Sequence, residues 1–157
     1  MLDFATFYGQ CYERTYRGLT LALGDRAVAE DATQEAFYRA LRHWRKVSTL
    51  DRPEAWVLVV GLNAGRDVYR KAARERRLPV TVGAGPGSGA EVQVDDRMLL
   101  GELLGALPDR QRQALVLRYV GGLPLVAVAE AMGIAEGTVK ATLHQALENL
   151  QRRSHHG

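Results

Sequence analysis

The chain of 157 residues has a single cysteine, Cys11, and no long hydrophobic run. One thiol excludes an internal disulfide and cannot supply a cysteine-rich zinc cage. The longest apolar run, residues 55–62, has eight residues, far fewer than the about 20 that span a bilayer. The first residues lack the basic start and apolar core of a secretory signal. We therefore expect a cytoplasmic protein with no membrane insertion.

Motifs of catalysis are also missing. The chain has no Ser/His/Asp set and no paired histidine ligands. Glycine is concentrated in residues 79–94, but its spacing departs from the G-x-G-x-x-G pattern of a phosphate-binding loop. That stretch instead predicts a flexible linker. We predict no catalytic residue, no metal site and no cofactor, and hence a protein that is not an enzyme.

The linker divides the chain into two lobes, residues 1–78 and 95–153, with a disordered tail predicted at 154–157. Apolar residues recur at three- and four-residue spacing in both lobes, which predicts an all-α fold of two small helical domains. In the first lobe we expect a helix that ends at Gly24, followed by helices over 27–47 and 54–77. The inward side chains predicted for the helix over 27–47 are Ala32, Ala36, Phe37, Ala40, Leu41 and Trp44.

The second lobe has the spacing of a helix-turn-helix. Its predicted helices cover residues 97–106, 110–120, 124–132 and 136–152. Ala129, Gly133 and Val139 supply the small residue that lets two helices approach, the left-handed turn and the β-branched residue buried between them. In such a unit the second helix enters the DNA major groove.

Three segments resemble parts of bacterial sigma factors. The order of these segments and the short linker are similar to the extracytoplasmic function group of the sigma-70 family. The segments resemble the core-polymerase-binding helix, the promoter-melting helix and the C-terminal DNA-binding domain of that family. In chain order they are residues 29–37 (AEDATQEAF), 53–57 (PEAWV), and 107–112 with 133–140 (LPDRQR and GIAEGTVK).

The resemblance implies that the first lobe docks on core RNA polymerase. Within that lobe Asp31, Gln34 and Glu35 lie within four residues and share one helical face. A capping cluster at a helix start is the alternative for Glu30 and Asp31, but it leaves Gln34 and Glu35 unexplained. The implied polymerase-binding residues are Asp31, Gln34, Glu35, Tyr38 and Arg42.

The resemblance also implies that the third helix captures and opens promoter DNA. Residues 39–77 hold eleven basic and four acidic side chains, a balance that suits a polyanion. By resemblance, residues 48–53 form the wall of a pocket for an unstacked base. For Trp56 the sequence leaves core packing and base stacking open, whereas Trp44 is structural. The implied DNA-binding residues are Trp56, Asn63, Arg66, Asp67, Arg70, Lys71 and Arg74.

In the last helix the resemblance implies contacts to an upstream promoter element. Family members usually carry serine and then arginine after the lysine, and a further arginine near position 145. Here Ala141, Thr142 and Gln145 stand instead, which predicts weaker or altered recognition because each lost phosphate contact lowers affinity; neutral change is the alternative. Residues 125–128 make the predicted helix over 124–132 apolar on almost every side, which predicts an exposed apolar patch that faces a partner. The implied contacts are Glu136, Thr138, Lys140, Ala141, His144 and Gln145.

These residues predict a sigma factor whose partners are core RNA polymerase, promoter DNA and an anti-sigma factor. One alternative is a stand-alone helix-turn-helix regulator, and another is a degenerate member that acts only by protein binding. The melting helix beside an acidic docking face favours the first reading, because a simple repressor has no use for that pairing. Cys11 is interpreted as a buried small residue, with redox sensing as its alternative.

Overall fold

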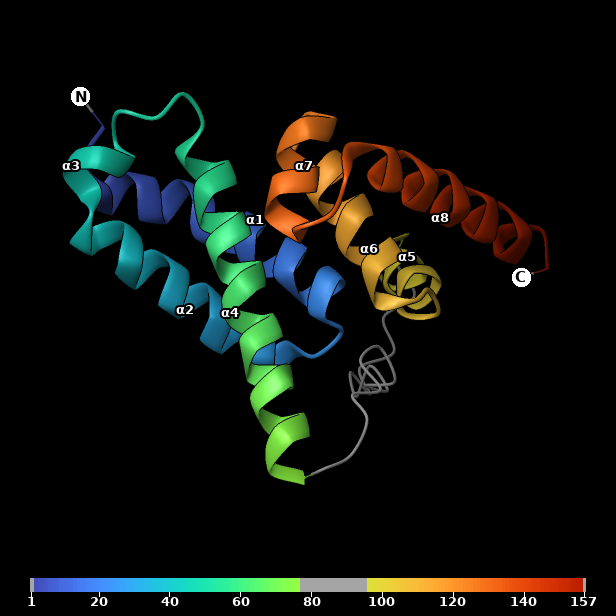
Figure 1. The fold of residues 1–157 in the computed structure, drawn as a ribbon. Helices are drawn as coiled ribbons and strands as arrows, with labels where there is room; N and C mark the ends of the chain where they lie inside the picture. Colours follow the sequence, from blue (N-terminus) through green and yellow to red (C-terminus); the bar gives the residue numbers. More distant parts are fainter. Residues whose placement is uncertain (1, 77–95, 157) are drawn as a thin grey trace.

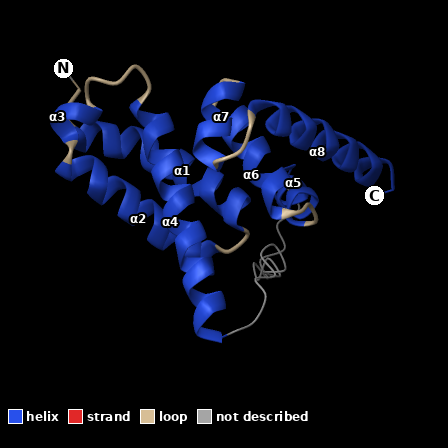
Figure 2. Ribbon diagram, viewed as in Figure 1, coloured by secondary structure: helices blue, strands red, loops and turns tan. Residues whose placement is uncertain are grey.

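A computed structural model describes residues 2–76 and 96–156, which form helices and turns without a strand (Figures 1 and 2). The predicted all-α fold is confirmed, while the predicted linker at 79–94 lies outside the described residues. The helices of the first lobe are α1 (Phe4–Leu23), α2 (Arg26–Arg42), α3 (Trp44–Val47) and α4 (Pro53–Arg76). Those of the second are α5 (Asp96–Gly105), α6 (Asp109–Leu115), the π-helical turn η1 (Val116–Val120), α7 (Leu125–Met132) and α8 (Glu136–His156).

Local capping sets the boundary between α1 and α2. Gly24 has φ 74° and donates its backbone N–H to the carbonyl of Thr20, so α1 ends in a left-handed residue that suits glycine. The carboxylate of Asp25 then accepts from the backbone N–H of Val28 at 3.1 Å and begins α2. The predicted end of the first helix at Gly24 is therefore confirmed.

The predicted helix over 27–47 is wrong in two respects. The chain leaves helical geometry at His43 (φ −112°, ψ 28°), so α2 ends at Arg42 and the short α3 follows. After this break the ring of Trp44 packs on Phe4 and Phe7 at centroid distances of 5.5 and 5.1 Å. Leu41, predicted inward, is 52% exposed, because the chain turns away at His43 and no described segment covers the last turn of α2.

Glycine allows α4 to lie close to α1 and α2. A Cβ atom at Gly61 would be 2.5 Å from Cδ1 of Leu19 and 3.5 Å from the carbonyl oxygen of Ala32. A Cβ atom at Gly65 would overlap the side chain of Leu23. These contacts hold the apolar half of α4 against the core and direct its basic half outward (Figure 1).

The second lobe contains the helix-turn-helix. Gly133 takes φ 68° between α7 and α8, and the backbone N–H of Ile134 donates to the carbonyl of Ala129 at 3.1 Å. Val139 is fully buried and Ala129 is nearly so. All three positions therefore have the geometry that their spacing predicts.

Residues 154–156, which belong to the tail predicted to be disordered, continue α8 to His156. Residue 157 lies outside the described residues. Arg152 and Arg153 lie near the C-terminal end of α8, where the negative end of a helix dipole favours cations. The hydroxyl of Ser154 donates to the carbonyl of Gln151 at 2.9 Å, which satisfies one of the last helical acceptors.

The two lobes share one apolar core. Leu19, Leu23 and Leu58 of the first lobe belong to the same buried cluster as Val116 and Leu117 of the second. A second cluster around Phe7 and Phe37 lies within the first lobe. None of the described helices combines the length and the apolarity that crossing a membrane requires.

Candidate nucleic-acid and protein interfaces

The exposed face of α2 carries the residues predicted to dock on polymerase. Asp31, Gln34, Tyr38 and Arg42 are exposed, and Glu35 is half-buried. The side-chain amide of Gln34 donates to the hydroxyl of Tyr12 at 3.0 Å, which fixes this residue against α1. Glu35 accepts from Nε of Arg39 at 2.8 Å. The structure therefore places all five predicted residues along one helix.

An apolar and aromatic strip accompanies these polar groups. Tyr38 is 53% exposed and Leu41 is exposed to a similar degree. The guanidinium of Arg42 lies over the ring of Tyr38, 5.9 Å from its centroid, a distance at which cation–π attraction operates. Large exposed apolar side chains beside charged ones are typical of a protein-binding surface. The sequence did not single out Leu41 for this face because its apolar character predicted a core position.

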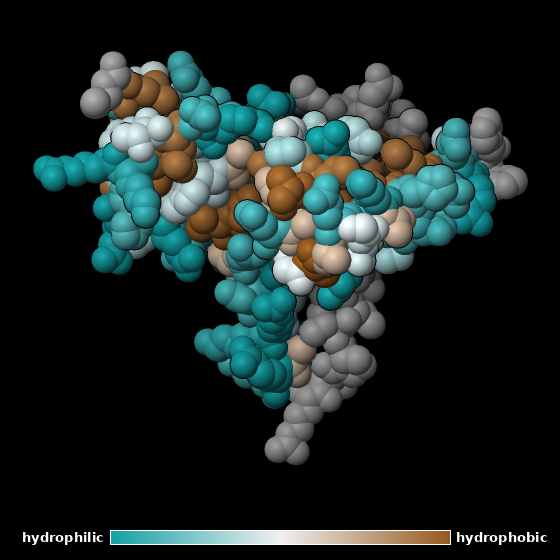
Figure 3. Space-filling view, turned by 45° about the horizontal axis from the view of Figure 1, so that its top comes forward, coloured by the Kyte–Doolittle hydropathy of each residue, from teal (hydrophilic) through white to brown (hydrophobic). Residues whose placement is uncertain are grey.

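The outer half of α4 forms a hydrophilic projection (Figure 3). Asp67, Arg70, Lys71 and Arg74 are exposed on it, and Asn63 is exposed near the middle of the helix. Arg70 lies 3.6 Å from Asp67, and this exposed pair leaves the guanidinium free to contact another group. Arg66 is half-buried; burial, and then the charges of Arg70 and Arg110, lower its pKa. The set thus concentrates positive charge along one helix, as a phosphate backbone requires.

The loop before α4 and the start of that helix lie beside the aromatic core of the first lobe. Trp56 packs against the cluster around Phe7 and Phe37 and keeps part of its surface in solvent. Arg52 lies on the loop and forms an ion pair with Glu54 at 3.2 Å. Trp56 therefore contributes to packing, and its exposed part remains available for another ring.

The six residues predicted to read DNA from α8 are all exposed. Nε2 of His144 lies 3.1 Å from a carboxylate oxygen of Glu148, and Gln145 donates to Asn149 at 3.4 Å. Asn149 in turn donates to Gln111 of α6 at 2.8 Å, which ties α8 to the helix behind it. The helix-turn-helix therefore presents this face of α8 outward on a packed support.

Family models match both lobes of the chain. The model of Sigma-70 region 2 matches residues 7–75, and the model of Sigma-70 region 4 matches residues 97–150. The chain belongs to the sigma-70 family of RNA polymerase sigma factors. Within that family it is an extracytoplasmic function sigma factor, and sigma factors are transcription initiation factors.

Similar proteins carry the same description. The ECF RNA polymerase sigma factor SigL of Mycobacterium tuberculosis is 35% identical over 137 residues, which cover 82% of this chain and 75% of SigL. SigK of Mycobacterium bovis is 31% identical over 159 residues, which cover 94% of this chain and 83% of SigK.

Two solved structures share the fold. The sigma factor RpoE of Bartonella quintana, in complex with the anti-sigma factor NepR, has a TM-score of 0.71 at 23% identity and covers 96% of this chain and 95% of its own. CnrH, in complex with the cytosolic domain of CnrY, has a TM-score of 0.55 at 22% identity, with 95% and 85% covered.

The apolar patch predicted on residues 125–128 of this sigma factor is smaller than its sequence implies. Val128 is fully buried, Leu125 and Ala127 are half-buried, and Val126 is 53% exposed. Packing of α7 against α8 and η1 buries most of the apolar surface of residues 125–128. Val126 is therefore the residue of this segment whose apolar side chain stays exposed.

Three arginines that sequence reasoning did not assign connect the two lobes. Nε of Arg112 donates to the carbonyl oxygen of Ala22 at 3.0 Å. Arg14 and Arg52 of the first lobe donate to carbonyl oxygens of the second. The sequence does not reveal this role of the three arginines. Their acceptors are backbone carbonyl groups, which every residue carries, so no particular residue type marks the partner.

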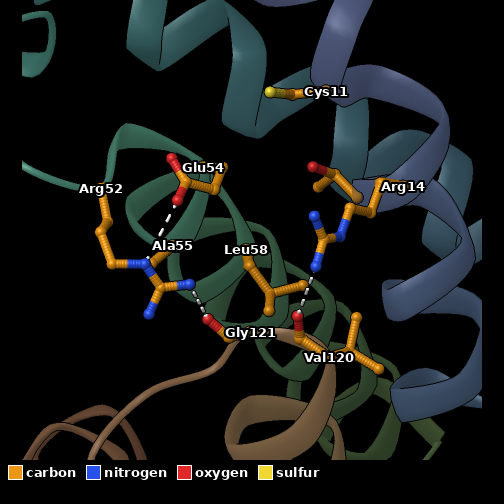
Figure 4. Close-up of a pocket in the computed structure, with 9 residues that line it drawn as sticks. Cys11, Arg14, Arg52, Glu54, Ala55, Leu58, Val120 and Gly121 are labelled. Atoms are coloured by element: carbon orange, nitrogen blue, oxygen red, sulfur yellow. Dashed lines mark hydrogen bonds and ion pairs between the residues drawn. The ribbon is translucent and has the colours of Figure 1, made fainter.

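Cys11 lines a small pocket of about 30 Å³ between the lobes, together with Arg14, Arg52 and Gly121 (Figure 4). The thiol is half-buried, and burial, followed by the charge of Glu54, raises its pKa. A raised pKa keeps the thiol protonated and unreactive, which favours the packing interpretation of Cys11 over redox sensing. The pocket has room for a water-sized group and is far smaller than a small-molecule site.

Proposed function

We propose that this sigma factor binds core RNA polymerase through α2, recognises a two-part promoter through α4 and α8, and melts the DNA along α4. It would act in the cytoplasm, where promoter DNA and polymerase are found. Binding energy to polymerase and to unstacked bases offsets the cost of unpairing, and the polymerase performs nucleotide transfer. An anti-sigma factor is the expected regulator, since the structural relatives RpoE and CnrH are each described in complex with a partner.

The observation that carries this proposal is the combination of two surfaces on one lobe. The α2 face offers acidic and amide groups with exposed Tyr38 and Leu41, which suits a basic protein surface with apolar contacts. The outer half of α4 offers Arg70, Lys71 and Arg74 to DNA. A factor that joins a protein machine to a nucleic acid needs both, whereas a stand-alone regulator needs only the helix-turn-helix.

Co-elution with bacterial core RNA polymerase on a sizing column tests the docking face. The test variant is Glu35→Lys. It reverses the charge of a carboxylate that now pairs with Arg39, four residues further along α2. Glu13→Lys is its matched control, because Glu13 forms the same kind of exposed i,i+4 pair with Arg17 on α1. Wild type and Glu13→Lys should shift to the polymerase peak and Glu35→Lys should not.

Two other outcomes would contradict the proposal. If no protein shifts but the free chain binds duplex DNA, the stand-alone regulator is the correct reading. If Glu35→Lys and Glu13→Lys reduce co-elution with polymerase equally, α2 does not provide the docking face.

A further inference from the structure

Gln145 belongs to a network of polar side chains that runs along α8 and onto α6. Its Nε2 donates to Oδ1 of Asn149 at 3.4 Å, and Nδ2 of Asn149 donates to Oε1 of Gln111 at 2.8 Å. Arg152, further along α8, also donates to Oδ1 of Asn149. Asn149 and Gln111 are half-buried where α8 packs against α6 (Figure 1), whereas Gln145 is exposed. Gln145 is therefore tethered at one atom to a supported network, and the rest of its amide stays accessible.

Arg152 fixes the direction of each hydrogen bond in this network. A guanidinium has N–H donors and no acceptor, so the Asn149 atom that meets Arg152 must be the amide oxygen. The NH2 group of Asn149 then meets an acceptor, Oε1 of Gln111. Because Oδ1 of Asn149 can only accept, Gln145 must turn its own NH2 group toward it. The orientation of the Gln145 amide thus follows from donor and acceptor chemistry.

This orientation leaves one acceptor and one donor of Gln145 for a ligand. Its Oε1 has no hydrogen-bond partner among the described residues, and its Nε2 carries a second N–H beside the one given to Asn149. In the major groove adenine presents the N6 donor beside the N7 acceptor, whereas guanine presents two acceptors, O6 and N7. Adenine therefore matches the free atoms of Gln145. Guanine requires two donors, one of which already serves Asn149.

Ala141 favours the same base pair. It lies four residues before Gln145, so the two exposed side chains are neighbours on the helix surface. A small apolar side chain suits contact with the methyl group that thymine presents in the major groove. An A·T pair carries both features, since adenine offers N6 and N7 and its partner offers the methyl group. Positions 141 and 145 are thus complementary to one kind of base pair.

We propose that Gln145 makes this sigma factor select adenine at one position of its upstream promoter element, and that Asn149 is the positioning residue that holds the amide for this contact. Asn149 is half-buried behind Gln145 and acts through that residue. The inference rests on the proposed function, because Gln145 reads a base only if α8 enters the major groove of promoter DNA. It assigns the residues at 141 and 145 a changed base preference instead of a simple loss of contacts.

Selection from duplex DNA of random sequence locates the base that residue 145 reads. The full chain is assembled with bacterial core RNA polymerase, the bound duplexes are enriched and sequenced, and the preferred sites of wild type and Gln145→Arg are compared. We expect one adenine of the wild-type site to become guanine in Gln145→Arg, with the other positions unchanged, since arginine donates to both O6 and N7. Gln10→Arg is the matched control, because it adds the same charge at an exposed glutamine of α1, and it should enrich the wild-type site.

The outcomes of this selection separate the inference from the function on which it rests. A wild-type protein that assembles with polymerase but enriches no upstream element overturns the proposed recognition by α8, and the inference with it. An enriched element that stays the same in Gln145→Arg overturns the role of Gln145 alone. The same holds if the position that changes carries a base other than adenine in the wild-type site.

Two variants at position 149 test the positioning role. Duplexes in which one A·T pair of the enriched element is replaced by G·C are compared with the original by fluorescence anisotropy, for each adenine in turn. At one position wild type should prefer A·T by about ten-fold, as one bidentate contact provides. Asn149→Asp keeps an oxygen that accepts from Gln145 and Arg152, so it should keep this preference. Asn149→Leu has a similar size but no acceptor, so the freed amide can turn its NH2 group to guanine and the preference should fall to about two-fold or less.

The ratio of the two affinities distinguishes positioning from a purely structural role. A structural role of Asn149 would weaken binding to both duplexes in Asn149→Leu and leave their ratio at the wild-type value, which overturns the positioning role. Equal loss of the preference in Asn149→Asp and Asn149→Leu overturns it as well, because the acceptor at position 149 would then not orient Gln145. A wild-type protein that discriminates at no adenine of the element overturns the whole inference.

Discussion

The phenolic hydroxyl of Tyr69 donates to the carbonyl oxygen of Leu23 at 2.7 Å, which ties the middle of α4 to the end of α1. This bond lies where the apolar half of α4 gives way to its basic half. It therefore fixes the direction in which the basic half leaves the core. The same C-terminal turn of α1 accepts Arg112 from the second lobe, at Ala22.

This bond predicts a loss of stability at high pH. Burial, with a smaller effect of Asp25, raises the pKa of Tyr69 from 10.0 to about 12. The folded state therefore holds the proton more tightly than the unfolded chain, and the stabilisation is complete below pH 10 and lost as the pH rises from 10 to 12. Because the side chain is half-exposed, we expect a loss of about 1 kcal/mol rather than the full value of the shift.

Chemical unfolding at pH 9, 10 and 11.5 measures this effect by comparison of wild type with Tyr69→Phe. The difference in unfolding free energy between the two should shrink over this range, since the phenylalanine variant has no hydroxyl to titrate. Titration of the other tyrosines and of the lysines changes the unfolding free energy of both proteins equally, so it cancels in the difference. A constant difference would show that Tyr69 does not titrate with the raised pKa.

Two glycines in helices predict opposite changes in stability. Gly65→Ala places a Cβ atom against Leu23 and should destabilise the protein by about 1–3 kcal/mol through overpacking. Gly9→Ala meets nothing within 4 Å and should stabilise α1 by about 0.5–1 kcal/mol, because alanine loses less backbone entropy than glycine. Urea unfolding of both variants measures the effects. Similar changes in the two proteins would mean that close approach of α4 and α1 does not depend on position 65.

Sequence patterns were sufficient where local chemistry decides the structure. Gly24 and Gly133 end helices because their left-handed turns need no partner elsewhere in the chain, and Val139 is buried in the same cluster as Ala129 of the preceding helix. The predicted burial of Leu41 was wrong because hydrophobic periodicity cannot show that the chain turns away from the core at His43. Arg112 could not be predicted, since its acceptor is a backbone carbonyl 90 residues away.

On α4, Arg70→Ala should impair promoter opening more than polymerase binding. The side chain is 61% exposed and its pair with Asp67 is long, so its loss should change stability by less than about 0.5 kcal/mol. Loss of a direct DNA contact should slow opening by about 10- to 100-fold, equivalent to about 1–3 kcal/mol. Fluorescence of 2-aminopurine in the promoter follows opening, and co-elution follows docking. Arg17→Ala, another exposed paired arginine, is the control, and equal loss of opening and docking in Arg70→Ala would refute the division of roles.

On α8, Lys140→Ala should reduce the salt dependence of duplex binding. Lys140 is exposed on the proposed DNA face, and each phosphate contact contributes about 0.9 to the slope of log affinity against log salt. Removal of one contact should therefore lower that slope by about 1 and weaken binding at low salt without changing sequence preference. Fluorescence anisotropy with a 30-base-pair duplex between 50 and 200 mM salt measures the slope. Arg17→Ala removes the same charge from α1 and should leave the slope unchanged, so a matching decrease in both variants would assign the effect to net charge instead of to α8.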